Sequence, residues 1–140
     1  MFGANWKSNC ETPERPTQYV TEGINYYHQG NYAAAVRSYD QALKLDPRNS
    51  YVMNLRGYAL FQQRDYRDAI TALKGSVEAN PDYAWGYFDL ARAECAAKDF
   101  EQARDSISMA ISKRPDLQGI MRADGEFTRI CASISDAYLK

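Results

Sequence analysis

The amino-acid sequence predicts an all-α protein built from three consecutive antiparallel helix pairs. The first observation is a fixed interval of 34 residues that separates three prolines: Pro47, Pro81 and Pro115. The second is that the same interval separates three polar residues, each followed by an aromatic residue: Asn31, Asp65 and Asp99. A period of this length, sustained over three units, indicates an array of helical repeats.

The first helix pair is expected at residues 17–29 and 33–45. Asn31 is a good N-cap, because its side-chain oxygen accepts a hydrogen bond from a backbone N–H group that the first helical turn leaves unpaired. Asp46-Pro47 ends the second helix, since proline cannot continue it. Between cap and stop, small and apolar residues recur at helical spacing: Ala35, Val36, Tyr39, Ala42 and Leu43.

The same signals place the second pair at 50–63 and 66–79, and the third at 84–97 and 100–113. A further column of small residues lets the two helix backbones of each pair approach closely: Gly23, Gly57 and Ala91. The third pair is the least regular, because Glu94 and Arg104 occupy expected apolar positions. Either these two side chains pair with each other at a partly wet edge, or the repeat pattern is locally loose.

These columns resemble the pattern of the tetratricopeptide repeat family. In the first repeat they read Tyr19, Gly23, Tyr26, Ala35, Tyr39, Ala42 and Pro47. In the second they read Met53, Gly57, Leu60, Ala69, Leu73, Ser76 and Pro81, and in the third Tyr87, Leu90, Ala91, Ala103, Ile107, Ala110 and Pro115. The resemblance covers residues 16–117, as repeats 16–49, 50–83 and 84–117. It implies a right-handed α-solenoid with one concave and one convex face.

A solenoid must cover its last repeat, and residues 118–140 are expected to supply a C-terminal capping helix. Asp124, which precedes Gly125-Glu126, is a candidate N-cap. The apolar stripe of this helix is expected to be Phe127, Ile130, Cys131, Ile134 and Leu139. Residues 116–123 are expected to form a short turn of helix at most. Residues 1–15, which contain Pro13 and Pro16, are expected to be a flexible segment.

Composition argues against several classes of function. The chain has 17 basic and 18 acidic residues, without the basic surplus of a nucleic-acid binder. It lacks both a run of about 18 apolar residues and a secretory signal, so membrane insertion is not expected. The three cysteines, Cys10, Cys95 and Cys131, lack CxxC spacing. We expect free thiols in a reducing compartment, which favours the cytoplasm.

Catalysis is not expected either. The single histidine, His28, has no cysteine or serine partner in a recognisable nucleophile motif. The sequence contains no HExxH motif, no glycine-rich phosphate loop and no cluster with metal-ligand spacing. We therefore expect a protein that is not an enzyme and that has no cofactor and no metal site.

Binding is the better class of function. In the family that the chain resembles, the first helix of each pair lines the concave face. On these helices, one stripe is free of the packing columns: Val20, Ile24, Tyr27 and His28, then Tyr51, Asn54, Leu55 and Tyr58, then Trp85, Phe88, Asp89 and Arg92. An apolar, aromatic surface of this kind is typical of an interaction site. The alternative is that Tyr27, Tyr58 and Phe61 pack between neighbouring repeats and that His28 is an ordinary polar residue at a helix end.

One subclass of the family grips the acidic C-terminal tails of large chaperones with lysine, asparagine and arginine side chains. The matching positions here are Val20, Ile24, Leu55, Trp85 and Asp89. An apolar wall that carries an acid cannot hold a carboxylate, so a chaperone-tail adaptor is not expected.

The leading hypothesis is a protein-interaction module that binds an apolar or amphipathic peptide or helix. A second hypothesis is a structural domain whose groove is filled by its own N-terminal segment, which contains Phe2 and Trp6, or by a second subunit in a homodimer. A third is a helper domain of a larger regulatory protein.

Overall fold

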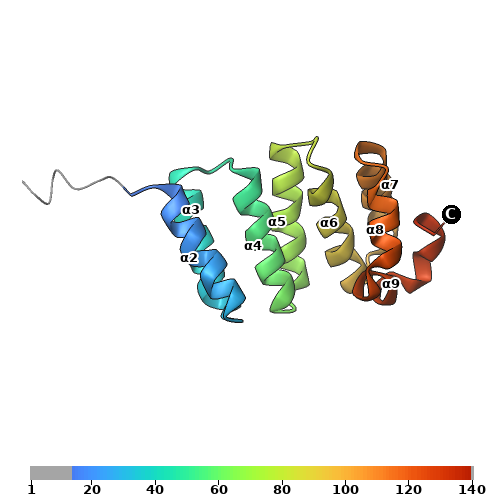
Figure 1. Cartoon of the computed structure of the whole chain (residues 1–140), viewed down its shortest axis with the longest axis horizontal. Coiled ribbons are helices and arrows are strands. Elements are labelled where there is room, and N and C mark those ends of the chain that lie inside the picture. Colours follow the sequence, from blue (N-terminus) through green and yellow to red (C-terminus); the bar gives the residue numbers. More distant parts are fainter. Residues whose placement is uncertain (1–13, 140) are drawn as a thin grey trace, which may run out of the picture.

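The computed structural model describes residues 14–139 and shows, within that range, an all-α solenoid of three antiparallel helix pairs (Figure 1). The paired helices are α2 (Pro16–His28) and α3 (Tyr32–Leu45), α4 (Ser50–Gln62) and α5 (Tyr66–Ala79), and α6 (Ala84–Ala96) and α7 (Phe100–Lys113). These bounds agree with the predicted helices to within one residue. Residues 1–13 of the predicted flexible segment lie outside the described residues.

The predicted helix stops are confirmed, and so are two of the three predicted N-caps. Helices α3, α5 and α7 each end two residues before the repeated proline. Asn31 Oδ1 accepts a hydrogen bond from the backbone N–H of Ala34 at 3.2 Å, and Asp65 Oδ1 accepts one from Asp68 at 3.4 Å. Asp99 differs, because its side chain makes no capping hydrogen bond.

The turn inside each pair uses a left-handed backbone residue. Gly30, Arg64 and Lys98 lie 34 residues apart and have φ angles of 76°, 64° and 65°. This conformation is easy for glycine and costly for a residue with a Cβ. The repeat is therefore visible in the backbone even though only the first of the three residues is a glycine.

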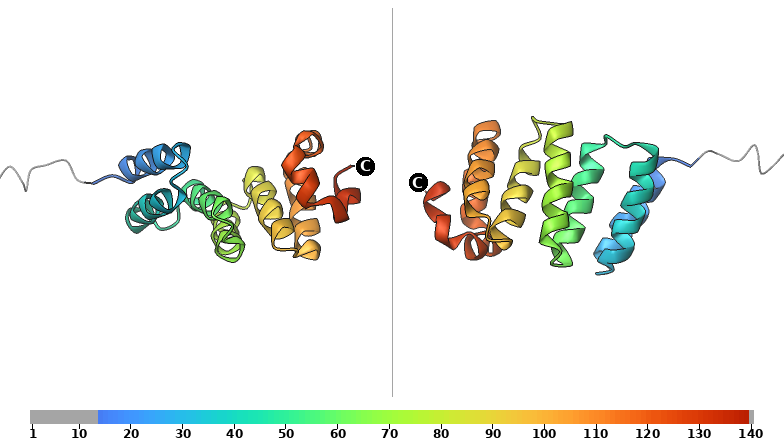
Figure 2. Two further views of the ribbon diagram at one scale, coloured as in Figure 1. Left: turned by 90° about the horizontal axis from the view of Figure 1, so that it is seen from below. Right: turned by 180° about the vertical axis from the view of Figure 1, so that it is seen from behind.

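The three pairs stand side by side along the long axis of the molecule (Figures 1 and 2), with α3 packed on α4 and α5 on α6. Small residues set the closest approaches within a pair. A Cβ at Gly57 would lie 2.6 Å from Cγ of Leu73, so α4 and α5 approach too closely for any side chain there. Gly23 faces the ring of Tyr39 in the same way.

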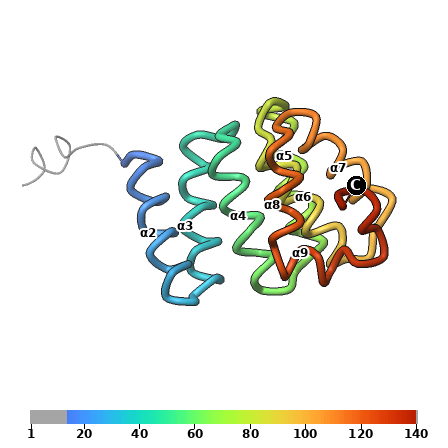
Figure 3. Tube along the Cα trace, turned by 45° about the vertical axis from the view of Figure 1, so that its right-hand side comes forward, coloured from blue at the N-terminus to red at the C-terminus, as the bar shows by residue number. Residues whose placement is uncertain are grey.

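The C-terminal region is helical, as predicted, but it is divided into three short elements. These are α8 (Leu117–Ala123), α9 (Gly125–Ile130) and a 3₁₀ helix, η1 (Ala132–Ala137). They gather on the α6–α7 end of the solenoid (Figure 3). Asp124 caps α9 as predicted, because its Oδ1 accepts the backbone N–H of Phe127 at 2.9 Å.

Two expectations for this region are corrected. Residues 117–123 form a seven-residue helix rather than a single turn at most. The predicted apolar stripe does not extend to Leu139, which is 50% exposed, whereas Tyr138 is buried in its place. The change from an α-helix to a 3₁₀ helix after α9 explains this difference, since it shifts which residues face the core.

In the irregular third pair, Glu94 and Arg104 each have a partner of their own. Glu94 and Arg104 do not pair with each other. Buried Glu94 accepts a hydrogen bond from the hydroxyl of Ser106, and burial raises the pKa of Glu94. Arg104 forms a bidentate ion pair with Asp136 of η1: its Nη2 donates to Oδ1 at 2.9 Å and its Nη1 donates to Oδ2 at 3.1 Å.

The expectation of free thiols is wrong for two of the three cysteines. Cys95 of α6 and Cys131 form a disulfide, with their Cα atoms 5.2 Å apart. They are 36 residues apart in the sequence and meet because α9 folds back on α6. The expectation of a cytoplasmic location was based on free thiols, so this disulfide removes its support. Cys10 lies outside the described residues.

None of the helices in the described range is long and apolar enough to cross a membrane.

Candidate functional site

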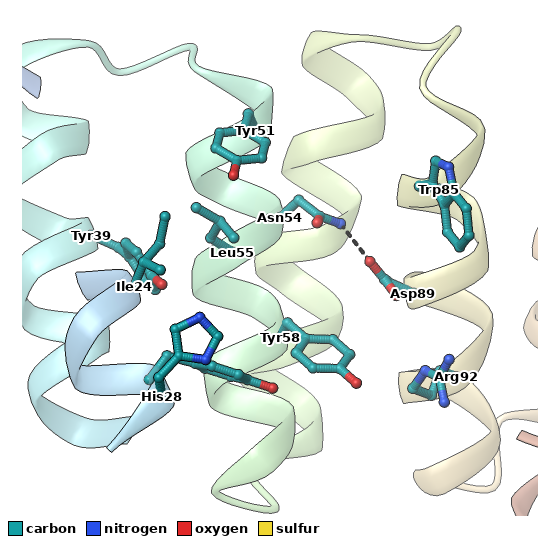
Figure 4. A pocket seen from close by; sticks show the side chains of 11 residues that line it. Ile24, His28, Tyr39, Tyr51, Asn54, Leu55, Tyr58, Trp85, Asp89 and Arg92 are labelled. Atoms are coloured by element: carbon teal, nitrogen blue, oxygen red, sulfur yellow. Dashed lines mark hydrogen bonds between the residues drawn. The ribbon is translucent and has the colours of Figure 1, made fainter. Parts of the chain in front are cut away.

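A pocket of about 470 Å³ opens on the face formed by α2, α4 and α6 (Figure 4). Its lining contains most of the side chains that the helical stripe predicted: Ile24, Tyr27, His28, Tyr51, Asn54, Leu55, Tyr58, Trp85, Asp89 and Arg92. Tyr39 of α3, a predicted packing residue, contributes to the wall as well. The first helices of the three pairs thus bring residues from positions 24 to 92 around one hollow, which we call the groove.

Two predicted groove residues lie elsewhere. Val20 packs, partly buried, against the core cluster around Tyr39. Phe88 is 1% exposed, and its ring centroid lies 5.0 Å from that of Phe127 in α9. Phe88 is a core residue because α9 covers it. The repeat pattern contains no information about where α9 lies.

The tyrosines of the groove contact each other across the repeats. The ring centroids of Tyr27 and Tyr58 are 5.8 Å apart, and those of Tyr58 and buried Phe61 are 5.9 Å apart. Burial raises the pKa of Tyr27 and of Tyr58, so both hydroxyls stay protonated at neutral pH. These two rings therefore join α2 to α4 and also line the groove.

Trp85 and Tyr51 form the upper part of the groove in Figure 4. Trp85 stacks on Phe88 with an interplanar angle of 17° and ring centroids 5.7 Å apart. The guanidinium of Arg114 lies 5.7 Å from the centroid of Trp85. Tyr51 is 50% exposed. The tryptophan is therefore held in place, while the tyrosine presents free apolar surface.

One hydrogen bond crosses the groove between α4 and α6. The side-chain amide of Asn54 donates to Oδ2 of Asp89 at 3.0 Å, as Figure 4 shows. Burial raises the pKa of Asp89 to about 6, although the hydrogen bond from Asn54 and the charge of Arg92 act in the opposite direction. The Asp89 carboxylate is therefore mostly ionised at neutral pH.

Arg92 is a buried cation whose charge is already paired. Its Nη2 donates to Asp124 at 2.8 Å and its Nη1 to Glu126 at 3.1 Å. Burial disfavours its charged form, but the hydrogen bond to Asp124 and the nearby acids outweigh burial and raise its pKa. At Asp124, burial alone would raise the pKa of the carboxyl, but the hydrogen bonds from Arg92 and from backbone N–H groups, together with the charge of Arg92, outweigh burial and lower that pKa.

Sequence reasoning did not find Asp124 and Glu126 as neighbours of the groove. The available signal was the capping pattern Asp124-Gly125-Glu126, which places two acids at the start of α9. Nothing in it indicated that α9 would meet α6. Within residues 14–139, no group of three or more His, Cys, Asp or Glu side chains is arranged to hold a metal ion.

Comparison with known families gives two matches. Two sequence models of the tetratricopeptide repeat family match residues 20–84 and 60–124. Together these matches span residues 20–124, which include every residue that lines the groove.

The chain is also similar to parts of individual proteins. The chain is 29% identical over 108 residues to the protein STIP1 homolog of Dictyostelium discoideum. It is also 29% identical over 84 residues to RNA polymerase II-associated protein 3 of Xenopus tropicalis. These alignments cover 77% and 60% of this chain, but only 19% and 13% of the two relatives.

Two solved structures have the same fold. The first repeat domain of Spaghetti (RPAP3), bound to the HSP90 peptide SRMEEVD, superposes with a TM-score of 0.75 at 22% identity, covering 90% of this chain and 94% of that one. MamA superposes with a TM-score of 0.76 at 22% identity, covering 97% of this chain and 79% of the other.

Proposed function

Because the chain belongs to the tetratricopeptide repeat family, a family of protein-interaction modules that are generally not catalytic, we propose that it binds an apolar or amphipathic peptide or helix of a partner protein in its groove. The observation that supports this proposal is the pocket of about 470 Å³, walled by aromatic and aliphatic side chains from three helices. Half-exposed Tyr51 leaves apolar area in water that a partner would cover.

The energetics are compatible with this role. Covering one large aromatic or aliphatic side chain contributes roughly 1.5–3 kcal/mol before the costs of ordering the partner are subtracted. Ile24, Leu55 and the rings of Tyr27 and Tyr58 are held by their own packing, so these side chains lose little freedom on binding. Preorganisation of this kind favours affinity.

The proposal differs from what some relatives do. The RPAP3 domain is bound to SRMEEVD, a peptide that ends in acidic residues. In the present chain, the positions that grip such tails in the chaperone-binding subclass are Val20, Ile24, Leu55, Trp85 and Asp89. None of them is cationic, and Asp89 would repel a carboxylate. We therefore propose a partner other than a chaperone tail.

Selection from a random-peptide display library on the immobilised protein tests the proposal. We expect enrichment of peptides rich in apolar residues on the wild-type protein and none on Leu55→Glu, which places a charge in the groove. The matched control is Leu45→Glu, because Leu45 is an exposed leucine outside the groove. Circular dichroism shows whether each variant keeps its helices. Equal enrichment on wild type and a folded Leu55→Glu would contradict the proposal.

The second candidate function is structural, with the groove filled by residues 1–15 of the same chain or of a second subunit. It rests on Phe2 and Trp6, which lie outside the described residues. Deleting residues 1–15 and measuring the molecular mass in solution tests it. A homodimer predicts a fall to the monomer mass, whereas self-occupation predicts stronger selection of peptides by the shortened chain. If neither changes, this candidate fails.

The cytoplasm remains our proposal for the compartment, and the Cys95–Cys131 disulfide weighs against it. Cytoplasmic thiols are normally kept reduced, whereas disulfides persist in oxidising compartments. Alkylation of free thiols in intact source cells, followed by mass spectrometry, decides between the two. Alkylated Cys95 and Cys131 would favour the cytoplasm, and an intact disulfide would exclude it.

A further inference from the structure

We propose that the groove recognises a basic side chain, a lysine or an arginine, on its apolar peptide partner, and that this side chain lies between the carboxylate of Asp89 and the rings of Trp85 and Tyr58. This inference rests on the proposed function, since it names the chemistry of the partner at the same site. It reverses the charge preference of relatives that hold acidic peptides.

The Asp89 carboxylate has an acceptor position left for a ligand. Its Oδ2 accepts the amide of Asn54 at 3.0 Å, while in residues 14–139 no hydrogen-bond donor is found for Oδ1. In Figure 4 the side chain lies between Trp85 and Arg92 and faces α4 across the groove. An ionised carboxylate with one free oxygen in a partly dry pocket is a strong acceptor for an ammonium or guanidinium group.

Arg92 balances the charge of this carboxylate only in part. Its two terminal nitrogens donate to Asp124 and Glu126, and its side chain is 9% exposed. Asp89, Asp124 and Glu126 are three acids around one guanidinium, so the cluster carries excess negative charge at neutral pH. A cation on the partner would balance this charge, whereas an acidic side chain would be repelled.

The aromatic walls favour the same ligand. Trp85, Tyr58 and Tyr51 line the pocket that contains Asp89. The face of an aromatic ring attracts a cation, and Trp85 already has one beside it, since the guanidinium of Arg114 lies 5.7 Å from its ring centroid. The hydrocarbon stem of a lysine or arginine packs on apolar neighbours such as Leu55 while its charged end reaches the carboxylate. His28 of α2, which also lines the pocket, lies away from Asp89 in Figure 4.

The test uses the same peptide selection on the wild-type protein, on Asp89→Asn and on Glu101→Gln. Asparagine at position 89 keeps an oxygen that accepts the Asn54 hydrogen bond and removes only the charge. Glu101 is an exposed acid on α7, away from the groove, so Glu101→Gln is the matched control. We expect the wild type and Glu101→Gln to enrich apolar peptides with one recurring lysine or arginine. On Asp89→Asn, apolar peptides persist but the basic residue is no longer enriched.

Binding measurements on one selected peptide then show how much its positive charge contributes to affinity. Replacing its lysine by norleucine, or its arginine by citrulline, removes the charge at nearly constant size. We expect binding to the wild type to weaken by about 10-fold and binding to Asp89→Asn to weaken much less, because only the attraction of the aromatic rings for the charge is left in that variant. Added salt should also weaken binding of the charged peptide to the wild type more than binding of the neutral one.

The outcomes separate this inference from the proposed function. Apolar peptides without a preferred basic residue, or with a preferred acidic one, would overturn the inference and leave the groove as a peptide site. Equal preference for a basic residue on wild type and on Asp89→Asn would also overturn it. Failure to enrich any peptide above the Leu55→Glu background would overturn the proposed function itself.

Discussion

Lys98 occupies a left-handed backbone position, with φ at 65°, where the first repeat has Gly30. A residue with a Cβ loses roughly 1–2 kcal/mol there, and glycine avoids that cost at some expense in chain entropy. Lys98→Gly should therefore stabilise the protein by about 0.5–1 kcal/mol in urea denaturation. Lys74→Gly is the control, because Lys74 lies inside α5 and glycine there should destabilise by about 1 kcal/mol. If the two substitutions changed the free energy of unfolding in the same direction, the prediction would be contradicted.

Asp89 is expected to reduce stability at neutral pH. Its pKa in the folded protein is about 6, above the ordinary value of 3.8, so the folded state binds the proton more tightly than the unfolded chain does. The associated stability is present below pH 4 and is lost as the pH rises through 6. Asp89→Asn should then be more stable than the wild type above pH 6, by on the order of 1–3 kcal/mol, and equal to it near pH 3.5. Urea denaturation at several pH values measures the free energy of unfolding of the wild type and of Asp89→Asn. If the difference between the two proteins did not depend on pH, the assigned pKa would be contradicted.

This residue also shows what sequence can and cannot predict at the smallest scale. Its place on the groove followed from helical spacing, because α6 repeats the register of α2 and α4. Its hydrogen bond to Asn54 and its nearness to the Arg92–Asp124 ion pair depend on the distances between helices, which no local pattern encodes. A residue that destabilises the fold at neutral pH is also a reasonable candidate for a functional role.

Among the elements, α9 depends most on a single covalent link. The Cys95–Cys131 disulfide joins it to α6 across 36 residues of sequence, and closing a loop of this length in the unfolded chain contributes about 3–4 kcal/mol. Cys131→Ser, or reduction of the wild type, should lower the free energy of unfolding by about 2–4 kcal/mol. Hydrogen exchange should rise first in α9. The control is to reduce Cys131→Ser, which should then lose no further stability; unchanged stability of the reduced wild type would contradict the prediction.

The six paired helices were predictable because each signal occurs three times. Where one copy is irregular, as at Glu94 in the third pair, the matching positions of the other two pairs still placed the helix. The C-terminal elements have no second copy in the chain, so their division into α8, α9 and η1 could not be predicted. The burial of Tyr138 and the meeting of Cys95 with Cys131 could not be predicted for the same reason.

At the scale of the whole molecule, the C-terminal region is part of a core rather than an appendage. One cluster of buried side chains joins α6 and α7 to the three C-terminal elements. It contains Phe88, Ala103 and Ile107 of the last pair together with Leu117, Met121, Phe127, Cys131, Ile134 and Tyr138. In a solenoid each repeat contacts only its neighbours, so the last repeat depends on its cap for the packing on its outer side.

A chain that ends at Asp116 should therefore lose more than the cap. Removing residues 117–140 exposes Phe88 and Ile107, which are fully buried in the intact protein, and takes Asp124 and Glu126 away from Arg92. The loss of these two ion pairs and of the apolar packing destabilises the last helix pair, and the bared apolar face favours association between molecules. We expect an aggregated protein, or one whose third helix pair has unfolded, as measured by light scattering and hydrogen exchange. Leu139→Ser, which alters the same region at a half-exposed position, should remain folded and keep the assembly state of the wild type. If the shortened chain kept that assembly state with an unchanged melting temperature, the last pair would be stable without its cap, and the buried cluster would contribute little to stability.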